Sequence, residues 1–115
     1  MTLPAINGTS ARAVFLASGF DHTCAVLDTG VAVCWGSGAF GSLGDGDTAN
    51  RSAPVGVAGV AASAVVLAAG EHHTCAVLDT GRLLCWGRDD DGQLGNDHRW
   101  GSGNSSLPVA VLGVP

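Results

Sequence analysis

The chain alternates short runs of β-forming residues with glycine-rich turns, and no stretch shows the 3.6-residue period of a helix. The run Ala64–Ala69 is continuously apolar, as expected of a strand buried on both faces. Further strands are predicted at Thr74–Leu78 and Arg82–Trp86, which flank a short turn, and at Val109–Val111. This pattern predicts an all-β fold of four-stranded sheets.

The pattern occurs twice. Segment Gly19–Gly46 recurs as Gly70–Asp97 at an offset of 51 residues, with 16 identities in 28 positions. Pro54 in the first copy matches Pro108 in the second. Four short strands per copy match one blade of a β-propeller, and two blades are too few for a closed propeller. We therefore expect a single repeat domain over residues 1–115, in which 3–9 is a stray closing strand of a preceding unit, 10–60 is repeat 1 and 61–115 is repeat 2.

The hairpin turn determines which cysteines face each other. A three-residue loop that ends in a left-handed glycine is a common connection. Centring it on Thr29 places Cys24 opposite Cys34 at a non-hydrogen-bonded site, where opposing Cα atoms lie about 4.5 Å apart. The same count about the second turn places Cys75 opposite Cys85. We therefore predict one disulfide in each copy, stabilising it by roughly 2–3 kcal/mol.

Two other uses of the cysteines stay open. The pair His-x-Cys occurs twice, so zinc could be bound by His22, Cys24, His73 and Cys75, although the nine residues between the cysteines of each copy exceed the usual two to four. Free buried thiols are the second alternative. We expect the two histidines to fix the adjacent turns by hydrogen bonds and no metal to be bound.

The repeated string Gly-x-x-His-Thr-Cys-Ala-Val-Leu-x-x-Gly, followed by Cys-Trp-Gly-x4-Gly-x-Leu-Gly, resembles the regulator of chromosome condensation repeat family. It is most similar to the secreted branch, in which two strand positions are cysteines. The resemblance covers about 110 of the 115 residues. It implies a propeller, usually of seven blades, that acts as a protein-binding scaffold. The repeated Trp35 and Trp86 are then expected to pack between blades.

Two blades cannot close a ring by themselves. The chain is therefore expected to be a fragment, a subunit of a ring made by several chains, or a unit of an open fibre. The exposed strand edges at both ends would otherwise template pairing with another chain.

Composition and charge narrow the function. The chain is 46% hydrophobic but only 5% aromatic, and it has 18 glycines. A core of such small side chains would be weak, so disulfide bonds would add to its stability. The net charge is −5 and the five basic residues are scattered arginines, which argues against nucleic-acid binding. The uncharged stretch Ser52–Gly70 contains Pro54 and glycines, so we expect two strands there and no membrane span.

No nucleophile–base set, phosphate loop or carboxylate pair is identifiable, so we expect no enzyme, no catalytic residue and no cofactor. The turn Asp89–Gly92 resembles part of a calcium loop. The first copy lacks its carboxylates, which favours a solvated acidic turn.

Two sets of surface residues are candidate sites. Asn7, Asn50 and Asn104 begin acceptor sequons, where about 0.6 would occur by chance, and are expected to be glycosylated if the protein is secreted. Unmodified turn asparagines are the alternative. Arg99 and Trp100 lie in an insertion unique to the second copy, and we expect them to contact a protein or glycan partner.

Together these features predict a non-catalytic, extracellular or cell-surface scaffold that self-assembles into a larger ring or fibre. Disulfides persist in such oxidising compartments. The alternative is a ligand- or protein-binding fragment of a longer secreted propeller. A nucleotide-exchange regulator of a small GTPase, the activity of the family's founding member, ranks third.

Overall fold

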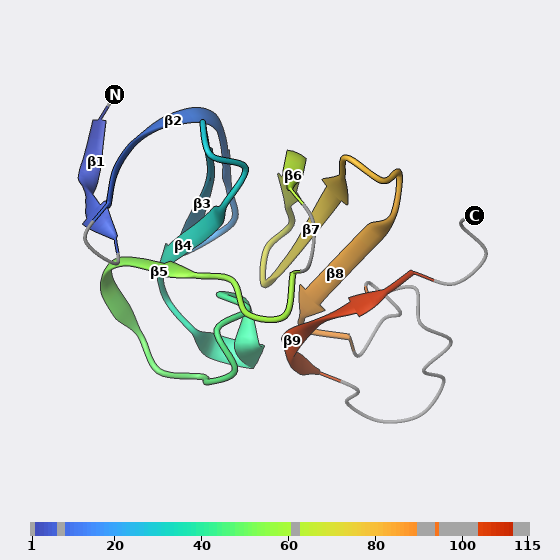
Figure 1. Cartoon of the computed structure of the whole chain (residues 1–115). Helices are drawn as coiled ribbons and strands as arrows, with labels where there is room; N and C mark the ends of the chain where they lie inside the picture. Colours follow the sequence, from blue (N-terminus) through green and yellow to red (C-terminus); the bar gives the residue numbers. More distant parts are fainter. Residues whose placement is uncertain (1, 7–8, 61–62, 90–93, 95–103, 112–115) are drawn as a thin grey trace.

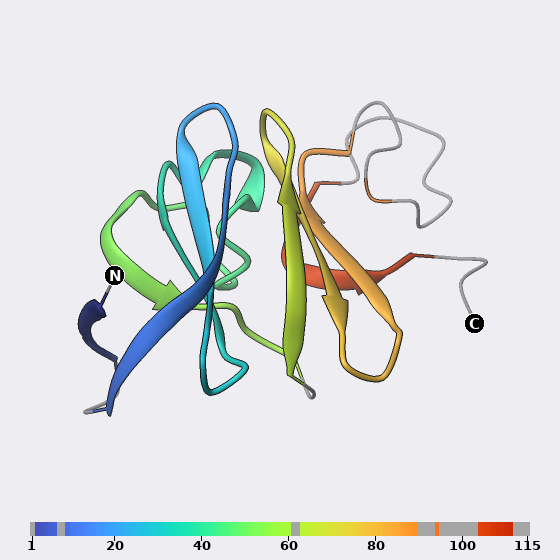
Figure 2. The same cartoon turned by 90° about the horizontal axis from the view of Figure 1, so that it is seen from above.

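A computed structural model describes residues 2–6, 9–60, 63–89, 94 and 104–111. In this part of the chain all regular structure is β-strand except for one 3-10 turn. The strands form two antiparallel sheets that lie side by side, in the orders β1-β2-β3-β4-β5 and β6-β7-β8-β9 (Figures 1 and 2). The all-β class and the two four-stranded units predicted from the sequence are confirmed.

The strands β2–β5 form the first blade and β6–β9 form the second blade. The first sheet contains β1 (Thr2–Ile6), β2 (Thr9–Ser18), β3 (His22–Leu27), β4 (Ala32–Gly36) and β5 (Arg51–Gly56), with the 3-10 turn η1 (Ala39–Gly41) between β4 and β5. The second sheet contains β6 (Ala64–Ala69), β7 (His73–Leu78), β8 (Leu83–Gly87) and β9 (Ser105–Ala110).

The two blades have the same register. In each central hairpin the cysteines are direct partners, and both loop glycines, Gly30 and Gly81, have φ of 86°. Each blade also has a bulge in its first strand, where Val14 and Val65 are the extra residues. The duplicated sequence therefore specifies the same local backbone twice.

One strand begins before its expected position. The outer strand β9 begins at Ser105, four residues before the predicted Val109, because a proline such as Pro108 is tolerated on an edge strand. The segment expected to close a preceding unit forms β1, which pairs with β2 of the first blade and comes near β5 (Figure 1).

The uncharged stretch 52–70 contains most of β5 and all of β6. Among the described residues, none forms a helix with the length and apolarity needed to span a bilayer.

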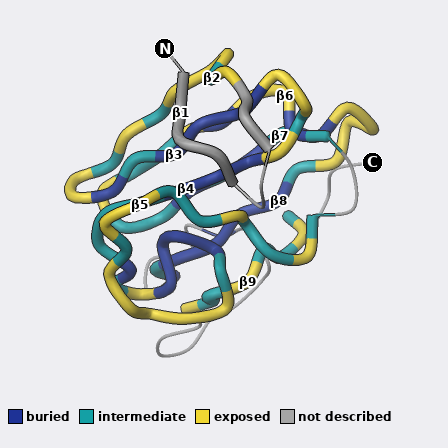
Figure 3. Tube along the Cα trace, turned by 60° about the vertical axis from the view of Figure 1, so that its left-hand side comes forward, coloured by how far each residue is buried: buried dark blue, intermediate teal, exposed yellow. Residues whose placement is uncertain are grey.

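The main core lies between the blades, where both sheets contribute apolar side chains. Figure 3 shows buried segments of both sheets. On the other face of the first sheet, Ala25, Leu27 and Val33 form a smaller cluster. Because apolar burial is the main stabilising term, much of the stability of each blade depends on its neighbour. The main cluster consists of Cys24, Val26, Ala32, Cys34, Leu43, Ala64, Leu67, Ala76, Leu78, Leu84 and Trp86.

Candidate functional site

Both hairpins contain a disulfide. Cys24 is bonded to Cys34 and Cys75 to Cys85, each pair with Cα atoms 4.0 Å apart. With these four thiols bonded, neither the zinc set nor free thiols are formed. No group of three or more metal-binding side chains occurs within the described ranges.

A chain of hydrogen bonds joins the two blades. The Thr74 hydroxyl donates to the Ser42 carbonyl at 3.0 Å, and the Trp86 indole N–H donates to the same carbonyl at 3.0 Å. His22 Nε2 lies 2.8 Å from Thr74 Oγ1. Since the only hydroxyl proton of Thr74 is already donated, His22 Nε2 must carry the proton and donate it. We call these four residues the seam.

The repeated Gly-x-Leu-Gly motif forms the first blade's side of the seam. Leu43 is fully buried in the core. A Cβ on Gly44, which has φ of +69°, would lie 2.7 Å from the Trp86 Nε1 atom, and a Cβ on Gly41 would lie 2.5 Å from the Ser106 Cα atom. Both glycines therefore allow the second blade to approach closely. Trp86 makes this approach and is fully buried between the blades, as expected.

The histidine does more than fix its own turn. The turn is closed by the backbone, with the Gly19 N–H donating to the His22 carbonyl at 2.8 Å, while the imidazole reaches the second blade. A Cβ on Gly19 would lie 2.3 Å from the His22 ring, so glycine is needed beside it. Burial of the imidazole lowers the pKa of His22 below 6.5.

The sequon asparagines brace loops in both blades. Asn50 accepts a hydrogen bond from the Gly38 N–H at 3.1 Å, and Asn104 accepts one from the Asp89 N–H at 2.9 Å. Gly38 and Asp89 are equivalent positions, so the two loops are held in the same way. A glycan would attach to the amide nitrogen, whereas these bonds use the amide oxygen, so glycosylation of Asn50 and Asn104 stays a prediction. Asn7 lies outside the described residues.

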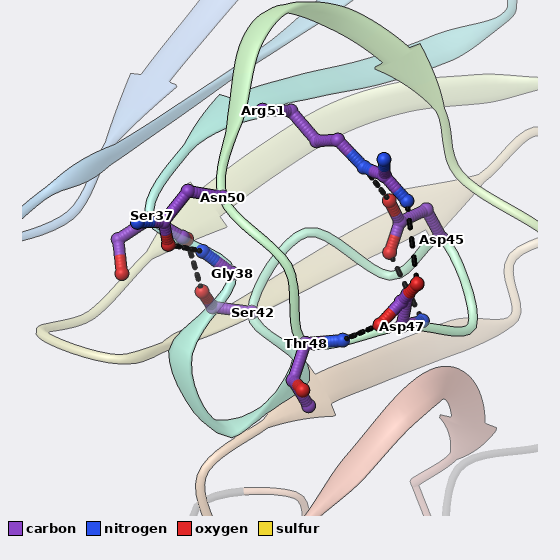
Figure 4. Close-up of polar contacts among 8 residues, drawn as sticks. All are labelled: Ser37, Gly38, Ser42, Asp45, Asp47, Thr48, Asn50 and Arg51. Atoms are coloured by element: carbon purple, nitrogen blue, oxygen red, sulfur yellow. Dashed lines mark hydrogen bonds and ion pairs between the residues drawn. The ribbon is translucent and has the colours of Figure 1, made fainter.

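An acidic turn braces the same connection in the first blade (Figure 4). Arg51 Nε donates to Asp45 Oδ2 at 3.0 Å, and its Nη2 atom lies 3.5 Å from Asp47 Oδ2. Ser42 Oγ donates to the Ser37 carbonyl at 2.9 Å, which fixes the segment that presents the Ser42 carbonyl to the seam. Arg51 is thus not an isolated charge, and the Asp-Gly-Asp string before it is the sequence signal for this ion pair.

Asp89 does not lie in a solvated turn, contrary to expectation. It is 2% exposed, and its Oδ1 atom accepts a hydrogen bond from the Leu94 N–H at 3.0 Å. The carboxylate is buried because it satisfies a backbone donor of the loop. The rest of this turn and the partner-binding candidates Arg99 and Trp100 lie outside the described residues.

The outer faces of the two blades carry residues equivalent to those of the seam, but no further blade in the described part of the chain lies against them. The 51-residue offset relates Thr74 to Thr23, Trp86 to Trp35 and His22 to His73. Within the described ranges, the side chains of Thr23, Trp35 and His73 make no hydrogen bond. Burial lowers the pKa of His73 as it does that of His22.

Two family models, both described as Regulator of chromosome condensation (RCC1) repeat, match the chain. One matches residues 13–42 and 65–93, and the other matches residues 30–77 and 80–115.

Similar curated proteins include three much longer ones. The chain is 33% identical to the E3 ubiquitin-protein ligase MYCBP2 of Danio rerio over 73% of its own length and 2% of that protein. It is 32% identical to the mitochondrial RCC1 domain-containing protein RUG3 of Arabidopsis thaliana, over 83% of this chain and 21% of that protein. With the human E3 ubiquitin-protein ligase HERC2, 32% identity extends over 95% of the chain and 2% of the protein.

Solved structures share the fold. Human WBSCR16 matches with a TM-score of 0.77 at 21% identity, over 94% of this chain and 28% of that one. Yeast RCC1 (Prp20), solved with Kap60 bound to it, matches with a TM-score of 0.72 at 26% identity, over 94% and 27% of the two chains. The present chain thus spans less than a third of each of these proteins.

Proposed function

The chain belongs to the Regulator of chromosome condensation (RCC1) repeat family, and we propose that it is a non-catalytic, protein-binding scaffold made of two consecutive propeller blades. Further blades of the same kind would cover its two open faces. The seam between the blades is the observation that supports this proposal, because residues equivalent to those of the seam recur on the two outer faces.

The polarity of the strands makes these open faces complementary. Successive side chains of a strand point to opposite faces of the sheet, so His22 faces the second blade and Thr23 faces away from it. The same holds for Thr74, which faces the first blade, and His73, which faces away. One end of the molecule thus offers Thr23 and Trp35, and the other end offers His73.

This complementarity favours head-to-tail association with a second copy of the chain. Such a contact is heterologous, so it closes into a ring only where the rotation between copies allows it and otherwise gives a fibre. Two-blade chains cannot by themselves build a ring with an odd number of blades. A seven-bladed ring would therefore need blades from a longer polypeptide as well.

Sedimentation equilibrium of the 115-residue chain over a range of concentrations tests the self-assembling form of the scaffold. We expect reversible association that the variant Thr23→Val with Trp35→Ala weakens. A folded chain that stays monomeric at every concentration would overturn self-assembly. The blades that cover the open faces would then have to come from a longer polypeptide.

We also propose an oxidising location, extracellular or at the cell surface. Two disulfides in one small domain support it, since such bonds are rare in reducing compartments. Titration of free thiols in the denatured, unreduced protein from its native source is the test, and four reactive thiols would contradict the proposal.

Two solved structures of one relative, yeast Prp20, concern protein binding. One yeast RCC1 structure contains Kap60, and another concerns binding to Gsp1p and histones. Because this chain covers only 27% of Prp20 in either structure, we rank regulation of a small GTPase behind the scaffold role.

A further inference from the structure

One end of the molecule carries an aromatic cluster that the seam does not use. The connection between β2 and β3 contains Phe20, and the connection between β6 and β7 contains Glu71 and His72. Figure 2 shows the two connections near each other at the same end, and the Phe20 N–H donates to the Glu71 carbonyl at 3.1 Å. Phe40 of η1 completes the cluster.

The His72 ring packs against two phenylalanine rings. Its centroid is 5.9 Å from that of Phe20, in an edge-to-face arrangement, and 5.1 Å from that of Phe40. The Arg88 guanidinium lies 5.3 Å from the Phe40 centroid. Phe20 is nevertheless 76% exposed and Phe40 is 38% exposed. A large apolar area therefore stays in water at the tip of the blades.

Two carboxylates flank the same ring. Asp21 Oδ1 lies 3.8 Å from His72 Nδ1, and Glu71 Oε1 lies 3.5 Å from His72 Nε2. Both acidic side chains are largely exposed. The exposed Phe20 ring packs edge-to-face on His72, so it lies in the same cluster as these two negative charges.

The blade architecture does not require these residues. At the 51-residue offset, Phe20 corresponds to Glu71, Asp21 to His72, and Phe40 to Asp91, so the two copies differ at each of these positions. By contrast, the motif residues at the seam recur. Phe40 also has φ of +61°, a conformation that is strained for a residue with a Cβ and that holds its ring in this cluster.

We propose that Phe20, Phe40, His72, Asp21 and Glu71 form a binding face for a basic segment of a partner protein. In this complex a lysine or arginine side chain lies over the Phe20 ring between the two carboxylates, and a neighbouring apolar side chain contacts Phe40. An aromatic face attracts a cation, and the flanking carboxylates add charge complementarity. This inference supplies the proposed scaffold with a binding face but does not depend on how its ring is completed.

Titration of the isotope-labelled 115-residue chain with two synthetic peptides, followed by amide chemical shifts, tests the inference. The first peptide is acetyl-Gly-Arg-Leu-Arg-Gly-amide, and the second replaces both arginines with glutamate. We expect saturable shifts at residues 20, 21, 40, 71 and 72 with the basic peptide only, weakening as salt is added.

Variants assign the binding to this face. Phe20→Ala, and separately Asp21→Asn with Glu71→Gln, should each weaken binding by about fivefold or more. The control Val14→Ala removes a comparably exposed apolar side chain on β2 and should leave binding unchanged. Equal binding of the acidic peptide, no binding of the basic one, or binding that the face variants leave unchanged would overturn the proposal, whatever the association state of the chain.

Discussion

His22 of the first blade and Thr74 of the second lie at equivalent ends of their strands, and their side chains form a 2.8 Å hydrogen bond across the seam. In each copy the histidine directly precedes the threonine in the sequence. Because neighbouring side chains in a strand point to opposite faces, each blade can donate through its histidine on one side and accept through its threonine on the other.

The first prediction compares Thr74→Val with the matched variant Thr23→Val. Thr74→Val leaves the buried His22 Nε2 donor without an acceptor and also removes the bond to Ser42, so we expect the free energy of unfolding to fall by about 2 kcal/mol. The same change at Thr23 should alter it by no more than about 0.5 kcal/mol in the monomer. Urea denaturation measures both, and equal losses would contradict the assignment of the seam.

Gly44→Ala should destabilise the protein by about 3 kcal/mol, since its Cβ would collide with the Trp86 indole and its backbone would be strained. Gly59→Ala is the control, because Gly59 has a similar φ of +72° but open space around it. That variant should lose only about 1 kcal/mol. The difference between the two measures the steric cost of a Cβ against the Trp86 ring, and similar thermal stabilities would argue against close contact at Gly44.

Stability should depend on pH through His22. Burial lowers its folded-state pKa below 6.5, so the unfolded state binds more protons in the window between the lowered pKa and 6.5. The contribution of the neutral imidazole is complete above that window and is lost as the pH falls through it. The free energy of unfolding should therefore decrease between about pH 7.5 and about pH 5.5.

The variant His22→Asn should flatten this dependence. It should not abolish it, because burial also lowers the pKa of His73. Denaturation curves at several pH values give the slope, and an unchanged slope in the variant would exclude His22 as the titrating group.

The disulfides should differ in their rate of reduction. Cys24 and Cys34 are fully buried beneath the second blade, whereas Cys75 is partly exposed on the open side. A thiolate must reach a sulfur atom to exchange with it, so mild reductant should open Cys75–Cys85 first. Alkylation at timed intervals followed by peptide mass mapping measures the order. Protection of both bonds at high protein concentration would indicate that a further blade covers Cys75.

The parts of this fold that depend on local sequence could be predicted. The hairpins follow from a loop glycine and the spacing of the cysteines, so Cys24 faces Cys34 without reference to any distant residue. The strand β9 begins earlier than the sequence predicts, because Pro108 interrupts the β-forming pattern and yet is tolerated on an edge strand.

Contacts between blades could not be predicted in this way. That His22 bonds to a residue 52 positions away depends on how two sheets pack, which the hydrophobic pattern does not specify. The aromatic cluster was missed for a related reason. The repeat reveals positions at which the copies agree, while Phe20 and His72 lie where they differ.

The shared core also bears on how the chain folds. Cys24 and Val26 are buried together with Ala64, Leu67 and Trp86 from the other sheet, so neither blade has a complete apolar interior by itself. Nearest-neighbour coupling of this strength in a repeat array produces cooperative melting. Both blades should therefore unfold in one calorimetric transition, and a polypeptide cut between β5 and β6 should yield two halves that regain structure only when mixed.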